Sequence, residues 1–227
     1  MSAASAPSAH SLRAVGAAYL CRRYAVLFYT LIVTLVAAPV LTALDLRGAF
    51  IELLLAANLL AAVMPVATGR SRRLLLIATA AAVLARLLTA WFDHPALSAM
   101  TLGLWTLIAI FAIVGALRFI MTGTSVDAEH IYAALGAYML AGLFFGVLYW
   151  AIEQIGPGTF NSAAPFSRMT GLYFSFVTLA TLGYGDIVPR TDIARGIAIV
   201  EAVGGQLFLA VMVARLVSLY GRGGPPK

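Results

Sequence analysis

The feature of this sequence that most restricts its fold is a series of six long apolar segments separated by short polar turns. A helix that crosses a bilayer needs about 20 predominantly apolar residues, and each segment is close to that length. The segments are residues 24–44, 49–67, 74–92, 97–120, 130–155 and 191–220. They predict an all-α membrane protein with six transmembrane helices per subunit.

The composition supports a membrane protein and disfavours other classes. Apolar residues make up 62% of the 227 positions and charged residues 11%, against about 45–50% and about 25% in soluble domains. The net charge of +6 is spread over scattered Arg and Lys residues, so no nucleic-acid partner is expected. The chain offers one cysteine, Cys21, and no nucleophile or acid–base pair at a recognisable spacing, so neither an enzyme nor a cofactor is expected.

The distribution of Arg and Lys predicts the orientation, because cytoplasmic loops carry an excess of these residues. With a cytoplasmic N-terminus, the inner side receives Arg13, Arg22, Arg23, Arg70, Arg72, Arg73, Arg118, Arg215, Arg222 and Lys227. The outer side receives Arg47, Arg168, Arg190 and Arg195. We therefore expect a cytoplasmic N-terminal segment (residues 1–23) and a cytoplasmic tail (residues 221–227). A cleaved signal peptide is the alternative for the N-terminus and would leave the remaining topology unchanged.

The fifth and sixth segments are separated by some 35 residues that contain "TLATLGYGD", Thr178 to Asp186. Gly183 and Gly185 permit positive φ, and irregular backbone at membrane depth is tolerated only where it lines protein or a water-filled cavity. Upstream, Ser167 can cap a helix of about three turns, whose C-terminal dipole favours a cation. The residues alone therefore predict a re-entrant cation site that enters from the outer side.

"TLATLGYGDIVP" resembles the selectivity-filter signature of potassium channels, T-x-x-T-V-G-Y-G-D, and "EAVGGQLFLAVMVARLVSLY" resembles the inner helix of bacterial members. The resemblance covers about Ala134 to Tyr220 and implies a pore domain at residues 130–220, assembled as a homotetramer. It implies a filter of Thr181, Leu182, Gly183, Tyr184 and Gly185. It also implies K⁺ bound at Thr181, Leu182, Gly183 and Tyr184 by backbone carbonyls and the Thr181 hydroxyl.

The resemblance places Gly205 at the gating hinge of the inner helix, and the adjacent Gly204 weakens the helix at the same point. Thr178, Asp186 and Glu201 are expected to support the filter. Glu201 either supports the filter, through Ser175 or Thr178, or serves packing alone. Three more inner-helix residues are expected to line the ion cavity: Gln206, Leu209 and Val213. For Gln206 the alternative is a bond to a neighbouring helix.

Several positions depart from the family pattern. Leu182 replaces the usual valine, Tyr173 and Phe174 replace two tryptophans, and Val177 stands where some members carry a glutamate that pairs with the filter aspartate. Asp186 is therefore expected to lack the carboxyl partner that those members provide.

Residues 24–121 resemble a four-helix voltage-sensor-like domain without its charges. A voltage-sensing helix needs several Arg or Lys residues, and the fourth segment offers Arg118 alone, which is expected to be an inner anchor. Glu52 and Arg86 are expected to form a structural salt bridge, and His94 and His130 to be interfacial residues. With short ends outside the spans, no regulatory domain is expected within the chain, and no regulatory partner can be named.

The sequence therefore predicts a potassium-selective channel that lies among the lipids of a bacterial plasma membrane. The channel is expected to conduct K⁺ passively and to have little or no voltage sensing. The alternative is a cation-binding subunit of a potassium transporter or a pore-like scaffold that does not conduct. Channel-like transporters usually carry four pore loops with a single filter glycine. A single loop with the whole GYGD sequence favours the channel.

Overall fold

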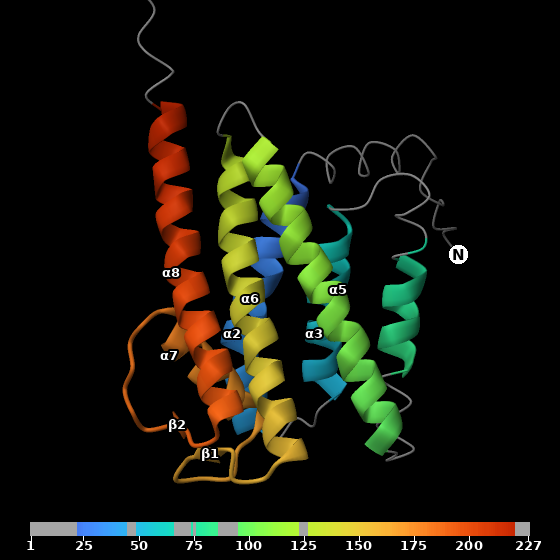
Figure 1. The fold of residues 1–227 in the computed structure, drawn as a ribbon. Helices are drawn as coiled ribbons and strands as arrows, with labels where there is room; N and C mark the ends of the chain where they lie inside the picture. The colour runs from blue at the N-terminus through green and yellow to red at the C-terminus, as the bar shows by residue number, and fades with distance from the viewer. Residues whose placement is uncertain are drawn as a thin grey trace, which may run out of the picture.

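The computed structural model describes residues 22–44, 49–65, 74, 76–85, 95–122 and 127–220. These residues are almost entirely helical (Figure 1). The labelled elements are α2 (Arg23–Ala43), α3 (Ala49–Val63), α5 (Pro95–Thr122), α6 (Ala128–Ile155), β1 (Phe160–Asn161), α7 (Arg168–Leu179), β2 (Val188–Pro189) and α8 (Asp192–Tyr220). A further short apolar helix, Leu76–Ala85, lies between α3 and α5 in the chain.

Helices occur at all six positions where the sequence predicts spanning segments, and they differ in length. Within the described residues, four are long and apolar enough to cross a membrane: Arg23–Leu41, Trp105–Thr122, Ala128–Ile155 and Asp192–Arg215. The second and third are shorter within the described residues, with apolar helical stretches at Leu53–Val63 and Leu76–Ala85. The chain is an all-helical membrane protein, and six complete crossings stay a prediction. Glu52, Arg86 and His94 have side chains outside the described residues, so their predicted roles are not tested.

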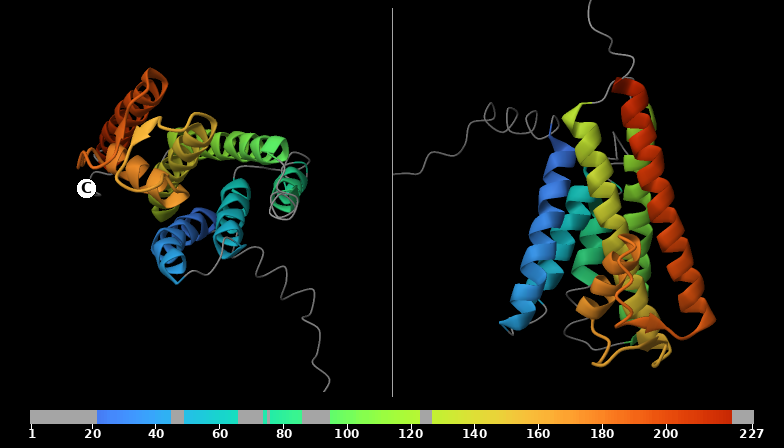
Figure 2. Two further views of the ribbon diagram at one scale, coloured as in Figure 1. Left: turned by 90° about the horizontal axis from the view of Figure 1, so that it is seen from below. Right: turned by 90° about the vertical axis from the view of Figure 1, so that its left-hand side faces the viewer.

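Helix α6 lies at the centre of the molecule, between α2 and α5 on one side and α7 and α8 on the other (Figure 2). Its buried positions are rich in small residues, including Ala133, Gly136, Ala137, Gly142 and Gly146. Small side chains let helix backbones approach closely, which is the main source of attraction between helices in lipid. Helices α2 and α5 therefore pack against α6 of the same chain, and α3 packs against α2 and α5.

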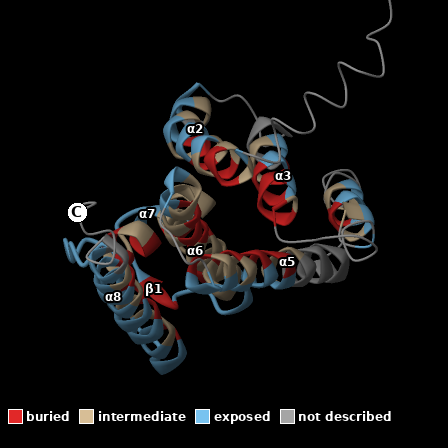
Figure 3. Cartoon of the chain, turned by 90° about the horizontal axis from the view of Figure 1, so that it is seen from above, coloured by how far each residue is buried: buried red, intermediate tan, exposed pale blue. Residues whose placement is uncertain are grey.

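Helix α8 is far less covered than α6. It lies at the edge of the bundle and is exposed over most of its surface (Figure 3), with large apolar side chains such as Ile199, Val203 and Leu207 uncovered. Lipid tails or further protein can cover such a surface without the cost that water would impose.

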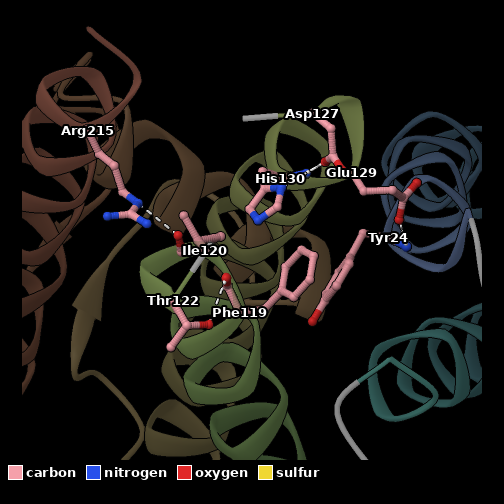
Figure 4. A network of polar contacts seen from close by, with 8 residues as sticks. All are labelled: Tyr24, Phe119, Ile120, Thr122, Asp127, Glu129, His130 and Arg215. Carbon is pink, nitrogen blue, oxygen red and sulfur yellow. Dashed lines mark hydrogen bonds and ion pairs between the residues drawn. The ribbon is translucent and has the colours of Figure 1, made fainter. Parts of the chain in front are cut away.

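At one end of the bundle, polar and aromatic contacts join four helices (Figure 4). The Tyr24 ring stacks on Phe119 with centroids 4.7 Å apart, and Phe119 stacks on His130 at 4.5 Å. Asp127 caps α6 by accepting hydrogen bonds from the His130 backbone N–H (3.0 Å) and ring Nδ1 (2.7 Å). Arg215 Nε of α8 donates to the Ile120 carbonyl in the last turn of α5 (2.8 Å). His130, predicted to be merely interfacial, is thus part of a packed junction.

At the opposite end, a short antiparallel pairing closes the segment around α7. Strand β1 pairs with β2, with Phe160 opposite Pro189 and Asn161 opposite Val188. Beneath it lies an aromatic cluster in which Tyr149 of α6 contacts Phe174 of α7 at 4.9 Å and Phe160 at 5.5 Å between ring centroids. These contacts fix α7 and the loop that follows it between α6 and α8.

Candidate functional site

The candidate site is the loop that follows α7, from Thr181 to Asp186. Ser167 caps α7 as the sequence predicts, with its hydroxyl accepting from the Thr170 backbone N–H at 3.1 Å. At the other end, Thr181 N donates to Thr178 O (3.0 Å) and Leu182 N donates to Val177 O (2.9 Å). The helix therefore ends in a tight turn, and its C-terminal carbonyls lie directly behind the loop.

The loop alternates between two backbone conformations. Thr181, Gly183 and Gly185 have positive φ values of 56°, 59° and 77°, whereas Leu182 and Tyr184 are not in the positive-φ region. The sequence predicted positive φ at the two glycines. The positive φ of Thr181, which is uncommon for a residue with a Cβ, was not foreseen. In an ordinary strand successive carbonyls point to opposite sides, and regular alternation of φ sign can bring them to one side.

The loop residues lie open at the surface of the single chain. Thr181 through Asp186 are all exposed, and a Cβ built on Gly183 or Gly185 would meet no heavy atom within 4 Å. Backbone that is neither helix nor strand needs partners for its polar groups at membrane depth. The described residues of a single chain do not supply a wall around this loop.

Asp186 at the end of the loop has a phenol as its partner. The Tyr173 hydroxyl of α7 donates to Asp186 Oδ2 at 2.9 Å, and the Tyr173 ring lies nearly parallel to that of Tyr184, with centroids 6.4 Å apart. From the sequence, Tyr173 was noted only as a replacement for tryptophan, and its bond to Asp186 was not foreseen.

A buried polar group connects α7 to the helices on either side. Glu201 of α8 is 1% exposed, and its two carboxyl oxygens lie 2.6 Å from the Tyr149 hydroxyl and 2.5 Å from the Ser175 hydroxyl. Ser175 was one of the two partners considered from the sequence, and Thr178, the other, is half-buried. Tyr149 was not predicted as a partner from the sequence. Its position within a spanning segment could have indicated one, because a buried phenol needs a hydrogen-bond partner.

Helices α6 and α7 cross at unusually short range. A Cβ on Gly146 would lie 2.7 Å from Leu172 Cα, and a Cβ on Gly171 would lie 2.6 Å from the Gly146 carbonyl oxygen. A Cβ on Gly142 would meet the Phe176 ring at 2.7 Å. Sequence reasoning did not select these glycines, although three glycines facing a single crossing hold α7, and so the loop, in place.

The inner-helix residues proposed from the sequence fall into two groups. Gly205 is buried against the end of α7, where a Cβ would lie 2.7 Å from Leu179 Cδ1, whereas a Cβ on Gly204 would meet nothing within 4 Å. Helix α8 is continuous through both glycines, and the hinge stays a prediction. Gln206, Leu209 and Val213 are exposed in the single chain, and the last two border a cavity of about 280 Å³ between α6 and α8.

Comparison with known proteins identifies the family. A family model described as "Ion channel" matches residues 133–222. Protein LctB of Geobacillus stearothermophilus is 35% identical over 100 residues, which cover 41% of this chain and 72% of LctB. The inward rectifier potassium channel Kirbac3.1 of Paramagnetospirillum magnetotacticum is 32% identical over 91 residues. The chain belongs to the potassium channel family.

The family model matches the second half of the chain, and the curated relatives match only part of it. The shared region covers 38% of the chain but only 28% of the inward rectifier's own length. A voltage-gated potassium channel of Aeropyrum pernix is 30% identical over 94 residues, which are 41% of this chain and 30% of that protein. No solved structure matches the chain significantly. The matched residues include α7, the loop and α8, so the family assignment rests on the part of the channel that contains the candidate site.

Proposed function

We propose that four copies of this chain form a potassium-selective pore that conducts K⁺ passively. The observation that carries the proposal is the positive φ at Thr181, Gly183 and Gly185, every second residue of the filter signature. In this arrangement the carbonyls from Thr181 to Tyr184, with the Thr181 hydroxyl, replace the hydration shell of K⁺. Potassium is the transported ion, and no other bound group is required.

The exposure of the loop supports a tetramer. One loop per chain can surround an ion only when several copies meet around a cyclic axis, and this loop is open at the surface of the single chain. The uncovered apolar surface of α8 supplies the matching contact area. In this assembly Gln206, Leu209 and Val213 face the shared cavity and Asp186 lies at the outer mouth.

We also propose that voltage has little influence on this pore. Helix α5 carries Arg118 as its one basic residue, four positions before the helix ends, and the Arg118 side chain is exposed. Moving one elementary charge through the membrane potential contributes about 2.3 kcal/mol per 100 mV, and steep voltage dependence needs several such charges per subunit. The relative in Aeropyrum pernix is named as voltage-gated, but the family match, residues 133–222, begins after α5.

The proposed topology follows the distribution of basic residues, with both termini in the cytoplasm of a bacterial cell. The junction around His130 and Arg215, next to Arg23 and Arg118 in the chain, then lies at the inner face, and β1, β2 and the loop face outward. The alternative function, a transporter subunit or a scaffold that does not conduct, would use the same cation site without passive flux.

The deciding experiment is ion flux from liposomes that contain the purified protein. A K⁺ gradient with a proton ionophore should drive rapid K⁺ and Rb⁺ flux and very little Na⁺ flux. Comparable Na⁺ and K⁺ flux would refute selectivity, whereas protein that is tetrameric but passes neither ion would favour the scaffold. Recordings across a wide voltage range test the absence of voltage sensing in the same preparation.

A further inference from the structure

Glu201, Tyr149, Ser175 and the Gly142 carbonyl form a buried polar group with more close oxygen–oxygen contacts than the two hydroxyl protons can account for. The Tyr149 hydroxyl lies 2.6 Å from Glu201 Oε2, and the Ser175 hydroxyl lies 2.5 Å from Glu201 Oε1. The same Ser175 oxygen lies 2.7 Å from the carbonyl oxygen of Gly142 on α6. Three oxygen–oxygen contacts at this distance require three protons.

The two hydroxyl groups supply only two of them. Serine and tyrosine each carry one O–H, and an ionised carboxylate and a backbone carbonyl are acceptors only. If Glu201 were ionised, Ser175 could donate its proton either to Glu201 or to Gly142 O. The other of these two contacts would then be a repulsive contact between two oxygen acceptors. The third proton can only come from the carboxyl group itself.

The surroundings of Glu201 favour the same state. Its side chain is 1% exposed, and no cationic residue pairs with it in the part of the chain that the structure describes. The titratable groups facing it are the phenols of Tyr149 and Tyr138 on α6; α7 presents Ser175, and α5 presents the apolar Ile113, Leu117 and Met121. An unpaired buried charge is costly, whereas a neutral acid with two hydrogen-bonded oxygens is not.

We propose that Glu201 is held as a neutral carboxylic acid that positions α7 by donating its proton to Ser175. The relay runs from Tyr149 O–H to Glu201 Oε2, from Glu201 Oε1–H to Ser175 Oγ, and from Ser175 O–H to Gly142 O. All three protons then have acceptors, and the relay ties α8, α7 and α6 together at one depth. Glu201 is a positioning residue, since it acts on the loop through α7.

The relay makes the hold on α7 sensitive to alkaline pH. Ionisation of Glu201 removes one donor, leaves Ser175 facing two acceptors and places a charge among apolar side chains. The stabilisation is therefore complete at low pH and is lost as the pH rises far enough to ionise the buried acid. The proposal rests on the proposed function only in giving α7 the task of supporting a filter.

Infrared difference spectroscopy of the full-length protein in liposomes tests the protonation directly. At neutral pH, Glu201→Gln should lose one protonated carboxylic C=O band relative to wild type. Glu153→Gln is the matched control, because Glu153 accepts the backbone N–H groups of Gly158 (2.7 Å) and Phe160 (3.0 Å), as an ionised carboxylate does. It should lose carboxylate bands alone. A Glu201→Gln spectrum that loses only carboxylate bands would overturn the proposal.

A second measurement covers the case in which Glu201→Gln does not fold. Ser175→Ala removes the acceptor of the acid proton, so the carboxylic C=O band should move to higher frequency; an unmoved band would contradict the relay. Where Glu201→Gln does fold, its thermal midpoint should stay level at alkaline pH while that of wild type falls. Equal decline in both proteins would also overturn the proposal. None of these readouts depends on ion flux, so a failure of K⁺ selectivity would not be confused with a failure of the relay.

Discussion

The close crossing of α6 and α7 gives the sharpest quantitative prediction. In Gly146→Ala the new Cβ lies 2.7 Å from Leu172 Cα and 3.1 Å from Leu172 N, whereas carbon atoms in contact are normally about 3.5–4.0 Å apart. Both partners are backbone atoms, so no side-chain rotation relieves the clash and the helices must separate by about 0.8 Å or more. Overpacking of this kind costs about 1–3 kcal/mol.

The helix itself gains stability from the same substitution, because alanine is favoured over glycine by about 0.5–1 kcal/mol in a helix interior. The two effects together leave a net loss of roughly 0–2.5 kcal/mol per subunit, centred near 1 kcal/mol. We expect a lower thermal midpoint in detergent and reduced K⁺ flux in liposomes, since α7 carries the loop.

Gly136→Ala is the matched control on the same helix. Its Cβ would lie 3.4 Å from Leu27 Cδ2, the flexible end of a side chain, so it should retain the propensity gain without the clash. The variant should be at least as stable as wild type. If Gly146→Ala had the same thermal midpoint and K⁺ flux as Gly136→Ala, the short crossing distance between α6 and α7 would not matter for stability.

Three further predictions concern the loop, the voltage response and the inner junction. Gly183→Ala or Gly185→Ala should abolish selective Rb⁺ flux because each position has a positive φ, and the new Cβ would make no steric clash within 4 Å that could explain the loss instead. Normal flux would show that this backbone conformation is dispensable. Arg118→Gln should leave the shallow voltage dependence of assembled channels unchanged in bilayer recordings, and steep activation of wild type would contradict the reasoning. The hydrogen bond from the His130 side chain lowers the pKa of the Asp127 carboxyl, so its stabilisation is present above the unfolded pKa of about 3.9 and is lost as the pH falls through the lower folded value. The thermal-midpoint difference between wild type and Asp127→Asn should therefore shrink only in acid, and a difference that shrinks between neutral pH and about pH 5 would contradict it.

The sequence by itself determined the features that depend on neighbouring residues. Apolar length predicted helices at all six positions, although the second and third are shorter within the described residues than their hydropathy suggested. The Ser167 cap and the positive φ of Gly183 and Gly185 could also be predicted, because a cap and a glycine conformation depend on a few adjacent residues.

Only the tertiary structure decided which distant residues meet. Tyr149 and Glu201 are 52 positions apart, and Ser175 and Glu201 are 26 apart, so no periodicity could select Tyr149 as the second partner. The bond from Tyr173 to Asp186 and the contact of Gly146 with Leu172 likewise depend on where α7 lies against the loop and against α6. Hydropathy determines that a segment is a helix in lipid, since every segment must satisfy its own backbone hydrogen bonds there. Which faces touch is set by the packing of small and polar side chains between helices, and that depends on the whole bundle.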